Sequence, residues 1–390
     1  RSGPYSLETE TFPVIDGLAE TAQALKTELR EIVKPMEALS ARLQKKLHEQ
    51  ADALDSDTRK RIESVAGAIT WRTENRLKAW IGILEALTRA PQNVNAAEQI
   101  FVDWMGIERA DGQAVDVGVY RHWIDPMKPF AAILTPHAHG IAVTSATLRA
   151  GAGGEENDDQ GSWESALRRT GAPHFTTDPQ VFSVPSPFDY AAQTRLFIVN
   201  DVNKNDMDQL AATYRVLFEA AGGGALGLFT AIHRLKAVQS RITAPLEEKG
   251  FPLYAQHVDG LDTSTLVDMF RTETHACLLG TDAVRDGVDV PGESLRLLVY
   301  DRVPWPRPTI LHKARRRAFG GRAYDEEITR LKLRQAFGRL IRRADDRGVF
   351  VMLDGALPSN LQNAFPVETP IVKAGLADTV RALRDFYAEK

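Results

Sequence analysis

Apolar residues recur at helical spacing through the N-terminal quarter of the chain, on either side of the polar break Asp55-Ser-Asp57. The two series are Leu18, Leu25, Leu29, Ile32, Met36, Leu39, Leu43 and Leu47, and then Ile62, Val65, Ile69, Leu77, Trp80, Ile81 and Leu84. Such spacing places the residues of each series on one face of a helix. The pattern predicts two long helices, the first bent near Pro35, joined by a short turn into an antiparallel hairpin.

A different pattern starts at Gln99, where residues 100–109 and 115–125 have the composition of two short strands. The Asp111-Gly112 pair between them is typical of a hairpin turn. Further on, Gly140-Ile-Ala-Val-Thr-Ser145 is predicted to be an apolar strand that ends at small hydroxylated residues. Such a strand end suits a parallel sheet whose loops meet a ligand at its carboxyl edge. The same hydroxyls could equally satisfy a turn or cap a helix.

Strands and helices alternate beyond Pro187. The predicted strands are 195–199, 225–230, 252–257, 276–280, 296–300 and 348–353, and the predicted helices include 232–242, 263–272 and 377–388. Strands separated by helices imply a parallel sheet covered on both faces, with right-handed crossovers. The fold class is therefore α/β, preceded by the long helical hairpin.

The stretch Leu331–Gly355 is predicted to be a basic helix followed by a buried strand. Its apolar stripe is Leu331, Leu333, Phe337, Leu340 and Ile341, and its polar face is Arg334, Gln335, Arg339, Arg342 and Arg343. Arg339 and Arg342 are three residues apart, so we expect them to point the same way along the helix. Taken alone, such a helix is more often a solvated basic surface than a site.

Composition describes an ordinary globular protein. The 390 residues are 43% hydrophobic and 26% charged, which suggests two or three domains. The single cysteine, Cys277, excludes a disulfide framework and a four-thiolate cluster, so no iron-sulfur cluster is expected in this chain. The pair His137-Ala-His139 has no third ligand at suitable spacing, and no metal site is expected. No apolar run approaches the ~20 residues needed to span a bilayer, so a cytoplasmic location without membrane contact is expected.

Charge is distributed unevenly along the chain, whose net charge is −4. From Arg302 to Arg343 thirteen Lys and Arg residues face three acids, a local balance of +10. Such a stripe either faces phosphates or is merely solvated.

Three blocks of the sequence resemble the motifs of a known family, in the family's order. Gln335-Ala-Phe-Gly-Arg-Leu-Ile-Arg342 has the form QxxGRxxR of motif VI in superfamily 2 helicases; Val143–Leu148 resembles motif III and Gly287–Gly292 resembles motif V. The segments SPF at 186–188, LFT at 228–230 and DRVPWPRP at 301–308 fall where the XPD/DinG branch of these DNA helicases has similar segments. The resemblance covers roughly residues 113 to 365, and several blocks in order are specific.

The resemblance implies roles for individual residues. It implies catalytic arginines at Arg339 and Arg342, nucleotide contacts at Gln335, Gly287 and Asp289, coupling hydroxyls at Thr144, Ser145 and Thr147, and DNA contacts at Thr230, His233, Thr281 and Trp305. Arginines suit the first role because a permanent positive fork stabilises charge developing on a γ-phosphate. The chain departs from many relatives at Arg285-Asp286, where they carry an aromatic-acidic pair.

The resemblance also implies a domain plan. Residues 1–98 would be an arch-like helical hairpin, 99–186 the tail of a first motor lobe including motif III, and 187–390 a second RecA-like lobe. The sequence contains neither a GxxxxGK[ST] phosphate loop nor an acidic DEAH-like block. ATP and Mg²⁺ would therefore be bound mainly by an N-terminal lobe that is missing here, and this part alone is expected to be inactive.

Two broad functions fit these patterns. The first is the C-terminal part of an ATP-dependent DNA helicase, with a role in DNA repair, that couples ATP hydrolysis to translocation on single-stranded DNA or at DNA junctions and to unwinding. The second is an inactive helicase-fold adaptor that binds nucleic acid; the non-Met start at Arg1 favours truncation over such decay. An unrelated nucleotide-dependent transferase would need a second catalytic constellation, which the sequence does not show.

Overall fold

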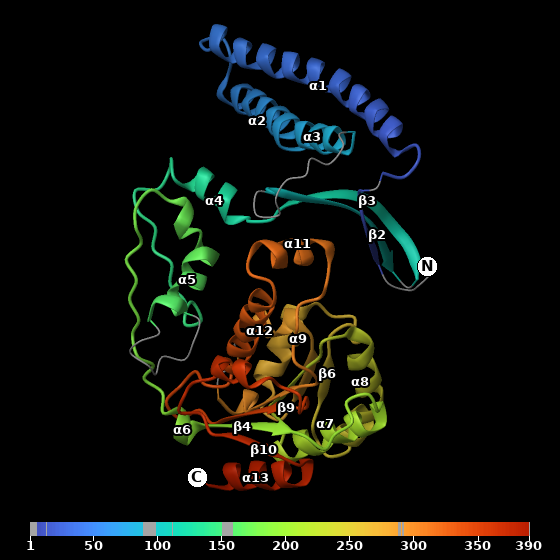
Figure 1. Cartoon of the computed structure of the whole chain (residues 1–390). Coiled ribbons are helices and arrows are strands. Elements are labelled where there is room, and N and C mark those ends of the chain that lie inside the picture. Colours follow the sequence, from blue (N-terminus) through green and yellow to red (C-terminus); the bar gives the residue numbers. More distant parts are fainter. Residues whose placement is uncertain are drawn as a thin grey trace. The chain divides into compact units, whose positions relative to one another are not determined.

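A computed structural model of the chain describes residues 6–12, 14–88, 99–110, 112–149, 159–287, 290 and 292–389. The chain forms two compact units (Figure 1). The first consists of Arg1–Pro126 with Arg307–Gly321, and the second of Met127–Pro306 with Arg322–Lys390. The second unit therefore includes the segment after Pro126 together with most of the C-terminal region. The boundaries expected at residues 98 and 186 are not the boundaries of these units.

The first unit contains the expected helical hairpin. Its helices are α1 (Leu18–Glu49), α2 (Ser56–Arg72) and α3 (Lys78–Leu87), and a π-helical turn at Thr73–Leu77 joins α2 to α3 without a break. The Asp55 carboxylate begins α2 by accepting hydrogen bonds from the backbone N–H groups of Asp57 and Thr58, at 3.0 and 2.9 Å. The hairpin prediction is confirmed, whereas the π-turn was not predicted.

A three-stranded antiparallel sheet completes the first unit. Its strands are β1 (Leu7–Glu10), β2 (Phe101–Ala110) and β3 (Gln113–Trp123), in that order. The β2–β3 hairpin was predicted and β1 was not. Helix α11 (Ile310–Ala318) belongs to this unit, because the Arg315 guanidinium donates hydrogen bonds to the carbonyls of Ile124 and Trp123 at 3.0 and 3.2 Å.

The residues of the cationic stripe predicted from Arg302 to Arg343 are consequently divided between the two units. Residues Arg307–Gly321 lie in the first unit and the rest of the stripe lies in the second. Several of its members are also engaged internally: Arg322 pairs with Glu326, and Lys332 pairs with Asp282.

The second unit is built on a seven-stranded parallel sheet. Its strand order is β10 (Ile371–Ala374), β4 (Thr194–Val199), β9 (Gly348–Met352), β8 (Leu297–Tyr300), β5 (Ala225–Leu228), β7 (Cys277–Gly280) and β6 (Leu253–Ala255). Every neighbouring pair runs parallel. All carboxyl ends therefore meet at one edge, as in other open α/β sheets.

Helices cover both faces of this sheet, as expected for strands that are apolar throughout. One core contains residues of α9 (Thr263–Thr272) and α12 (Arg322–Phe337). The other contains residues of α7 (Met207–Ala221), α8 (Ile232–Glu247) and α13 (Leu376–Ala388). Alternate strand residues enter the two cores; Ile198 belongs to the first and Val199 to the second. The predicted α/β class and its strands beyond Pro187 are confirmed.

The short elements of the second unit are mostly helical. They are α4 (Met127–Leu134), α5 (Asp159–Thr170), α6 (Tyr190–Gln193), α10 (Asp282–Gly287) and the 3₁₀ turns Ala172–His174, Gly292–Leu295 and Ser359–Ala364. None of the helices within the described ranges is long and apolar enough to cross a membrane.

The predicted strand Gly140–Ser145 is wrong for this structure. These residues are extended chain with no strand assignment, and Ile141 and Val143 are 45% and 51% exposed. A strand needs a neighbour to satisfy its backbone groups, and the described residues supply none here.

Helix α12 ends on a phenylalanine that anchors the first core. The Phe337 ring lies 5.5 Å from that of Phe365 and 6.3 Å from that of Phe350, measured between centroids, and its side chain is buried. We predict that Phe337→Ala lowers the free energy of unfolding by about 3–5 kcal/mol because it leaves a cavity. Urea denaturation measures this loss. Leu331→Ala, at a half-buried position of the same helix, should cost clearly less, and equal losses would contradict the assignment.

Candidate functional site

Polar residues follow the strands at the carboxyl edge of the parallel sheet. In strand order they are Asn200 after β4, Asp354 after β9, Asp301 after β8, Thr230 after β5, Thr281 after β7 and Gln256 after β6. Such an edge is where open α/β sheets bind their ligands. It brings Thr230 and Thr281, predicted from the resemblance, onto adjacent strands.

A buried ion pair lies at the centre of this edge. The Arg234 Nε donates to Asp301 Oδ2 at 2.5 Å, and the two side chains are 6% and 0% exposed. The other carboxylate oxygen accepts the backbone N–H of Thr230 at 3.1 Å, and Arg234 also donates to the Lys204 carbonyl at 2.8 Å. Burial raises the pKa of Asp301, while the hydrogen bond and charge of Arg234 act in the opposite direction. The pair therefore fixes the backbone at Thr230 and the loop after β4.

A second acid ties the same loop to the neighbouring strand. The Lys204 ammonium donates to Asp354 Oδ1 at 2.5 Å, and the Ala356 N–H donates to the same oxygen at 3.3 Å. The Arg302 guanidinium donates to Asn205 Oδ1 at 2.6 Å. Neither Asp301 nor Asp354 was predicted as a site residue. Each directly follows an apolar run that was predicted as a strand, and that position indicates the carboxyl edge of the sheet. Lys204 and Arg234 carry no such signal.

Thr281 is held by the last strand of this row. Its backbone N–H and its hydroxyl both donate to Gln256 Oε1, at 3.0 and 2.8 Å, and Gln256 in turn donates to the Thr263 hydroxyl at 3.1 Å. Among the other residues expected to contact DNA, His233 is exposed at the start of α8. Trp305 is 40% exposed and lies after the buried Pro304.

Helices α10 and α12 bring the blocks that resemble motif V and motif VI together. Lys332 Nζ of α12 lies 2.8 Å from Asp282 Oδ2 of α10, and Arg285 Nη1 lies 2.9 Å from the other oxygen of that carboxylate. Gly287 ends α10, and Gln335 is half-buried in the last turn of α12. Asp289 lies outside the described residues.

The expectation that one helix carries Arg339 and Arg342 is wrong. Helix α12 ends at Phe337, and the residues from Gly338 onward form a turn. The Asp346 carboxylate stabilises this turn by accepting the backbone N–H groups of Arg342 and Arg343, at 2.6 and 2.7 Å. The helical spacing argument therefore does not apply to these arginines. Arg339 is half-buried and Arg342 is exposed.

A buried glutamine holds the same turn from the sheet side. Gln193 Nε2 lies 3.2, 3.1 and 3.0 Å from the carbonyl oxygens of Arg343, Ala344 and Asp346. Gln193 and the Asp346 carboxylate together fix the backbone of this turn at several points.

The segment with the coupling hydroxyls reaches α12. Arg334 donates to the Arg149 carbonyl, and also to those of Ala364 and Asn363 at 3.2 Å each. Burial, followed by the charges of Arg169 and Arg330, lowers the pKa of Arg334 to about 10, which leaves it charged at neutral pH. The N–H of Thr147 and its hydroxyl contact Ser145 Oγ, each at 3.2 Å.

A glutamate of α12 makes a second link to this segment. Glu327 accepts hydrogen bonds from the Ser165 hydroxyl and from Arg168, and lies 3.5 Å from Arg169. Arg169 itself donates to the Leu148 carbonyl at 2.7 Å. The structure thus joins Ser145–Arg149 and α5 to the helix that precedes Arg339.

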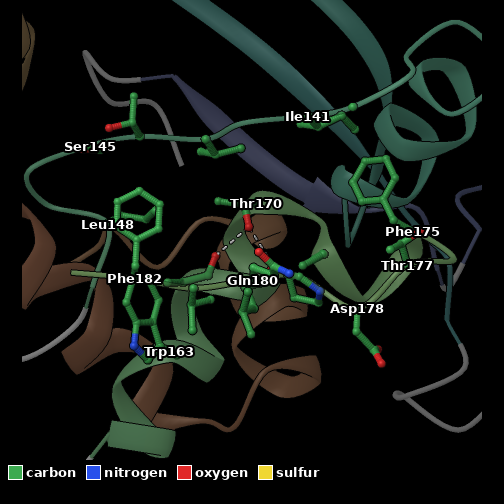
Figure 2. A pocket seen from close by; sticks show the side chains of 18 of the residues that line it. Ile141, Ser145, Leu148, Trp163, Thr170, Phe175, Thr177, Asp178, Gln180 and Phe182 are labelled. Atoms are coloured by element: carbon green, nitrogen blue, oxygen red, sulfur yellow. Dashed lines mark hydrogen bonds between the residues drawn. The ribbon is translucent and has the colours of Figure 1, made fainter.

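The segment that contains Thr144 and Ser145 (the hydroxyl segment) also lines a large hollow. This hollow, of about 800 Å³, lies between residues 138–149, helix α5 and residues 175–184 (Figure 2). Phe182 and Val184 are 83% and 77% exposed. Thr144 and Ser145 are exposed on its wall. Two apolar segments without strand partners therefore face solvent here.

No group of three or more His, Cys, Asp or Glu residues that could hold a metal ion occurs in the described part of the chain. The carboxylates of the carboxyl edge are engaged by Arg234 and Lys204.

Comparisons with known proteins relate part of the chain to helicases. Residues 214–370 match the model of the helicase C-terminal domain. The ATP-dependent helicase DinG of Mycobacterium tuberculosis is 36% identical over 186 residues, which are 45% of this chain and 27% of that protein. The ATP-dependent DNA helicase YoaA of Escherichia coli is 35% identical over 202 residues, 47% of this chain and 31% of that protein. A solved structure of an XPD helicase aligns with a TM-score of 0.44 and 15% identity, covering 95% of this chain and 65% of the other.

The matched range, residues 214–370, contains β5, α10, α12 and the turn that carries Arg339 and Arg342 (the arginine turn). The chain is therefore similar to these DinG and YoaA helicases over less than half of its own length, in agreement with the resemblance of its sequence motifs. The matched stretches are under a third of the length of the two curated relatives.

The buried ion pair of the carboxyl edge gives a stability prediction. Asp301→Asn would leave the Arg234 guanidinium buried without a counter-charge, and should lower the free energy of unfolding by about 3–5 kcal/mol. Asp208→Asn is the matched control, because its pair with Arg241 is exposed and such pairs contribute little. Both values come from urea denaturation. Indistinguishable losses would show that the pair does not hold this edge.

Proposed function

We propose that this chain is the C-terminal part of an ATP-dependent DNA helicase. In this proposal it supplies the arginines on one side of an ATP cleft and a polar edge that contacts single-stranded DNA. The observation that carries the proposal is the arginine turn inside the helicase C-terminal domain. It follows α12 directly and is fixed by Asp346 and Gln193. A rigidly held turn with two arginines suits electrostatic stabilisation, which works through groups already in place.

The individual roles follow from the residue types. Arg339 and Arg342 would stabilise the charge that develops on the γ-phosphate. Gln335, Gly287 and Asp289 would contact the nucleotide beside them. The pairing of Lys332 with Asp282 supports this grouping, because it ties the helix of Gln335 to the helix that ends at Gly287.

The phosphate cradle and Mg²⁺ would come from another lobe. The sequence lacks a phosphate loop, and the described residues form no metal site. The exposed segments at Ile141–Val143 and Phe182–Val184 support a missing neighbour, since apolar extended chain is otherwise paired or buried. A sheet added there would turn Gly140–Ser145 into the strand that its sequence predicts.

Thr144, Ser145 and Thr147 would then couple nucleotide state to lobe movement. The links from Arg334 to the Arg149 carbonyl and from Arg169 to the Leu148 carbonyl support this role. They connect the end of the hydroxyl segment to the helix that leads into the arginine turn. A shift of the hydroxyl segment would therefore displace the helix that precedes Arg339.

DNA contacts are proposed at the carboxyl edge, through Thr230, His233, Thr281 and Trp305. Backbone charge and stacking on exposed aromatic rings are how proteins grip single strands. Trp305 and His233 are exposed, as such a role requires. The alternative is an adaptor that binds nucleic acid without catalysis. It would make the same DNA contacts, but its arginine turn would have no catalytic role.

The arginines are tested in the gene product that includes the phosphate-binding lobe. Arg339→Ala and Arg342→Ala should each lower kcat for ATP on the order of 10³-fold, roughly 4 kcal/mol of transition-state stabilisation, with nucleotide affinity nearly unchanged. Arg339→Lys should rescue poorly because an ammonium lacks the planar fork. Steady-state hydrolysis and nucleotide titration separate the two effects.

Arg322→Ala is the control for these variants, because the Arg322 side chain is exposed and pairs with Glu326 one turn away on the same helix. It should hydrolyse ATP at the parental rate. Arginine-turn variants that keep full turnover but lose DNA affinity would move this turn from the ATP cleft to the DNA surface and favour the adaptor.

DNA binding by the 390-residue chain should be weak, independent of sequence and steeply dependent on salt. Neutralised phosphates release counterions, so the logarithm of affinity falls linearly with the logarithm of salt concentration. Fluorescence anisotropy of a labelled single strand across a salt series measures the slope, and a scrambled strand of equal length is the control. A flat response, or discrimination between the two strands, would contradict binding through the backbone.

A further inference from the structure

The helical hairpin of the first unit carries an open groove beside its π-turn. The groove has a volume of about 430 Å³ and is lined by Ile32, Met36, Trp71, Arg72, Arg76 and Trp80, among others. Trp71 and Trp80 are 52% and 49% exposed. The buried core of the hairpin lies elsewhere, at Ala22, Leu84 and Leu87. The two indoles are therefore not explained by packing of the hairpin itself.

The π-turn is what places both indoles in one groove. Trp71 and Trp80 are nine residues apart, and in an uninterrupted α-helix nine steps of about 100° would put them on opposite sides. The π-turn at Thr73–Leu77 accommodates about one extra residue per turn, which leaves the two only about 80° apart. Single π-turns of this kind are frequent at functional sites.

Charge in the groove has one sign. Arg72 and Arg76 line it, and no carboxylate is among the described residues that do so. The Arg76 guanidinium carbon lies 5.1 Å from the centroid of the Trp71 ring, a cation–π arrangement. The acids Glu37 and Glu74 of the same helices both pair with Lys78, at 2.9 and 2.6 Å. A ligand with planar aromatic groups and negative charge would complement this surface.

We propose that the groove binds the unpaired bases of single-stranded DNA, with bases stacked on Trp71 and Trp80 and the backbone phosphates near Arg72 and Arg76. Exposed aromatic rings flanked by arginines grip single strands in this way. The choice of DNA as the polymer rests on the proposed function. The site itself is separate from the carboxyl edge, and it assigns a second DNA contact to the hairpin. Duplex DNA would not fit, because its bases are already stacked on one another.

Binding of a fluorescein-labelled oligothymidylate to the purified 390-residue chain tests the proposal. Trp71→Ala and Trp80→Ala should each raise Kd on the order of 10-fold, and Arg76→Gln should raise it less while flattening the salt dependence. The matched controls are Leu39→Ala and Val65→Ala, exposed apolar positions on the same helices outside the groove. They should bind as the parental chain does, and far-UV circular dichroism verifies that every variant keeps its helices.

The possible outcomes distinguish this inference from the proposed function. Groove variants that bind normally, while Trp305→Ala weakens binding, would overturn the groove and leave the proposed function intact. No binding by the parental chain would overturn both the groove and the DNA contacts of the second unit. Equal loss of affinity for duplex DNA would contradict base stacking. Sedimentation that shows a self-associating chain, made monomeric by Trp80→Ala, would make the groove an interface between copies instead.

Discussion

A parallel sheet that is covered on both faces can offer polar groups only at the ends of its strands. In this protein that constraint places Asp301, Thr230, Thr281 and Asp354 in one row. The row would be unstable without compensation, because an unpaired buried carboxylate is strongly unfavourable. The Arg234–Asp301 ion pair supplies that compensation and at the same time fixes the backbone N–H of Thr230. Stability and site geometry therefore depend on the same contact.

Helix α12 connects the parallel sheet to the rest of the second unit. Its apolar side, including Leu333 and Phe337, is buried in the sheet core, while Glu327 and Arg334 hold the segment that precedes and includes α5. Directly after it, Asp346 and Gln193 fix the arginine turn. One helix thus packs into the core, binds the segment Ser145–Arg149 through Arg334 and leads directly into the arginine turn.

Patterns that depend on local spacing and burial were predictable from the sequence. The hairpin helices follow from their apolar repeats, and the strands beyond Pro187 from their apolar runs. The strand predicted at Gly140–Ser145 is absent from the structure. Its apolar run was not sufficient, since a strand exists only with a neighbour and the described residues supply none. The end of α12 was missed because the apolar spacing continues to Leu340 and Ile341, whereas the helix stops at Phe337 and the turn after it is held by the nearby Asp346 carboxylate. The π-turn leaves no mark in the apolar spacing, and the placement of α11 in the first unit depends on contacts of Arg315 with residues far away in the sequence.

In the proposed function, this chain supplies one side of a divided ATP site. The most direct test of this role is ATP hydrolysis with Mg²⁺ and saturating single-stranded DNA, measured for the 390-residue chain and for the gene product that includes the phosphate-binding lobe. We expect no DNA-stimulated turnover from the chain alone and robust turnover from the longer protein, because only the longer protein would contain both the phosphate cradle and the arginines. Robust DNA-stimulated hydrolysis by the 390-residue chain would contradict this expectation.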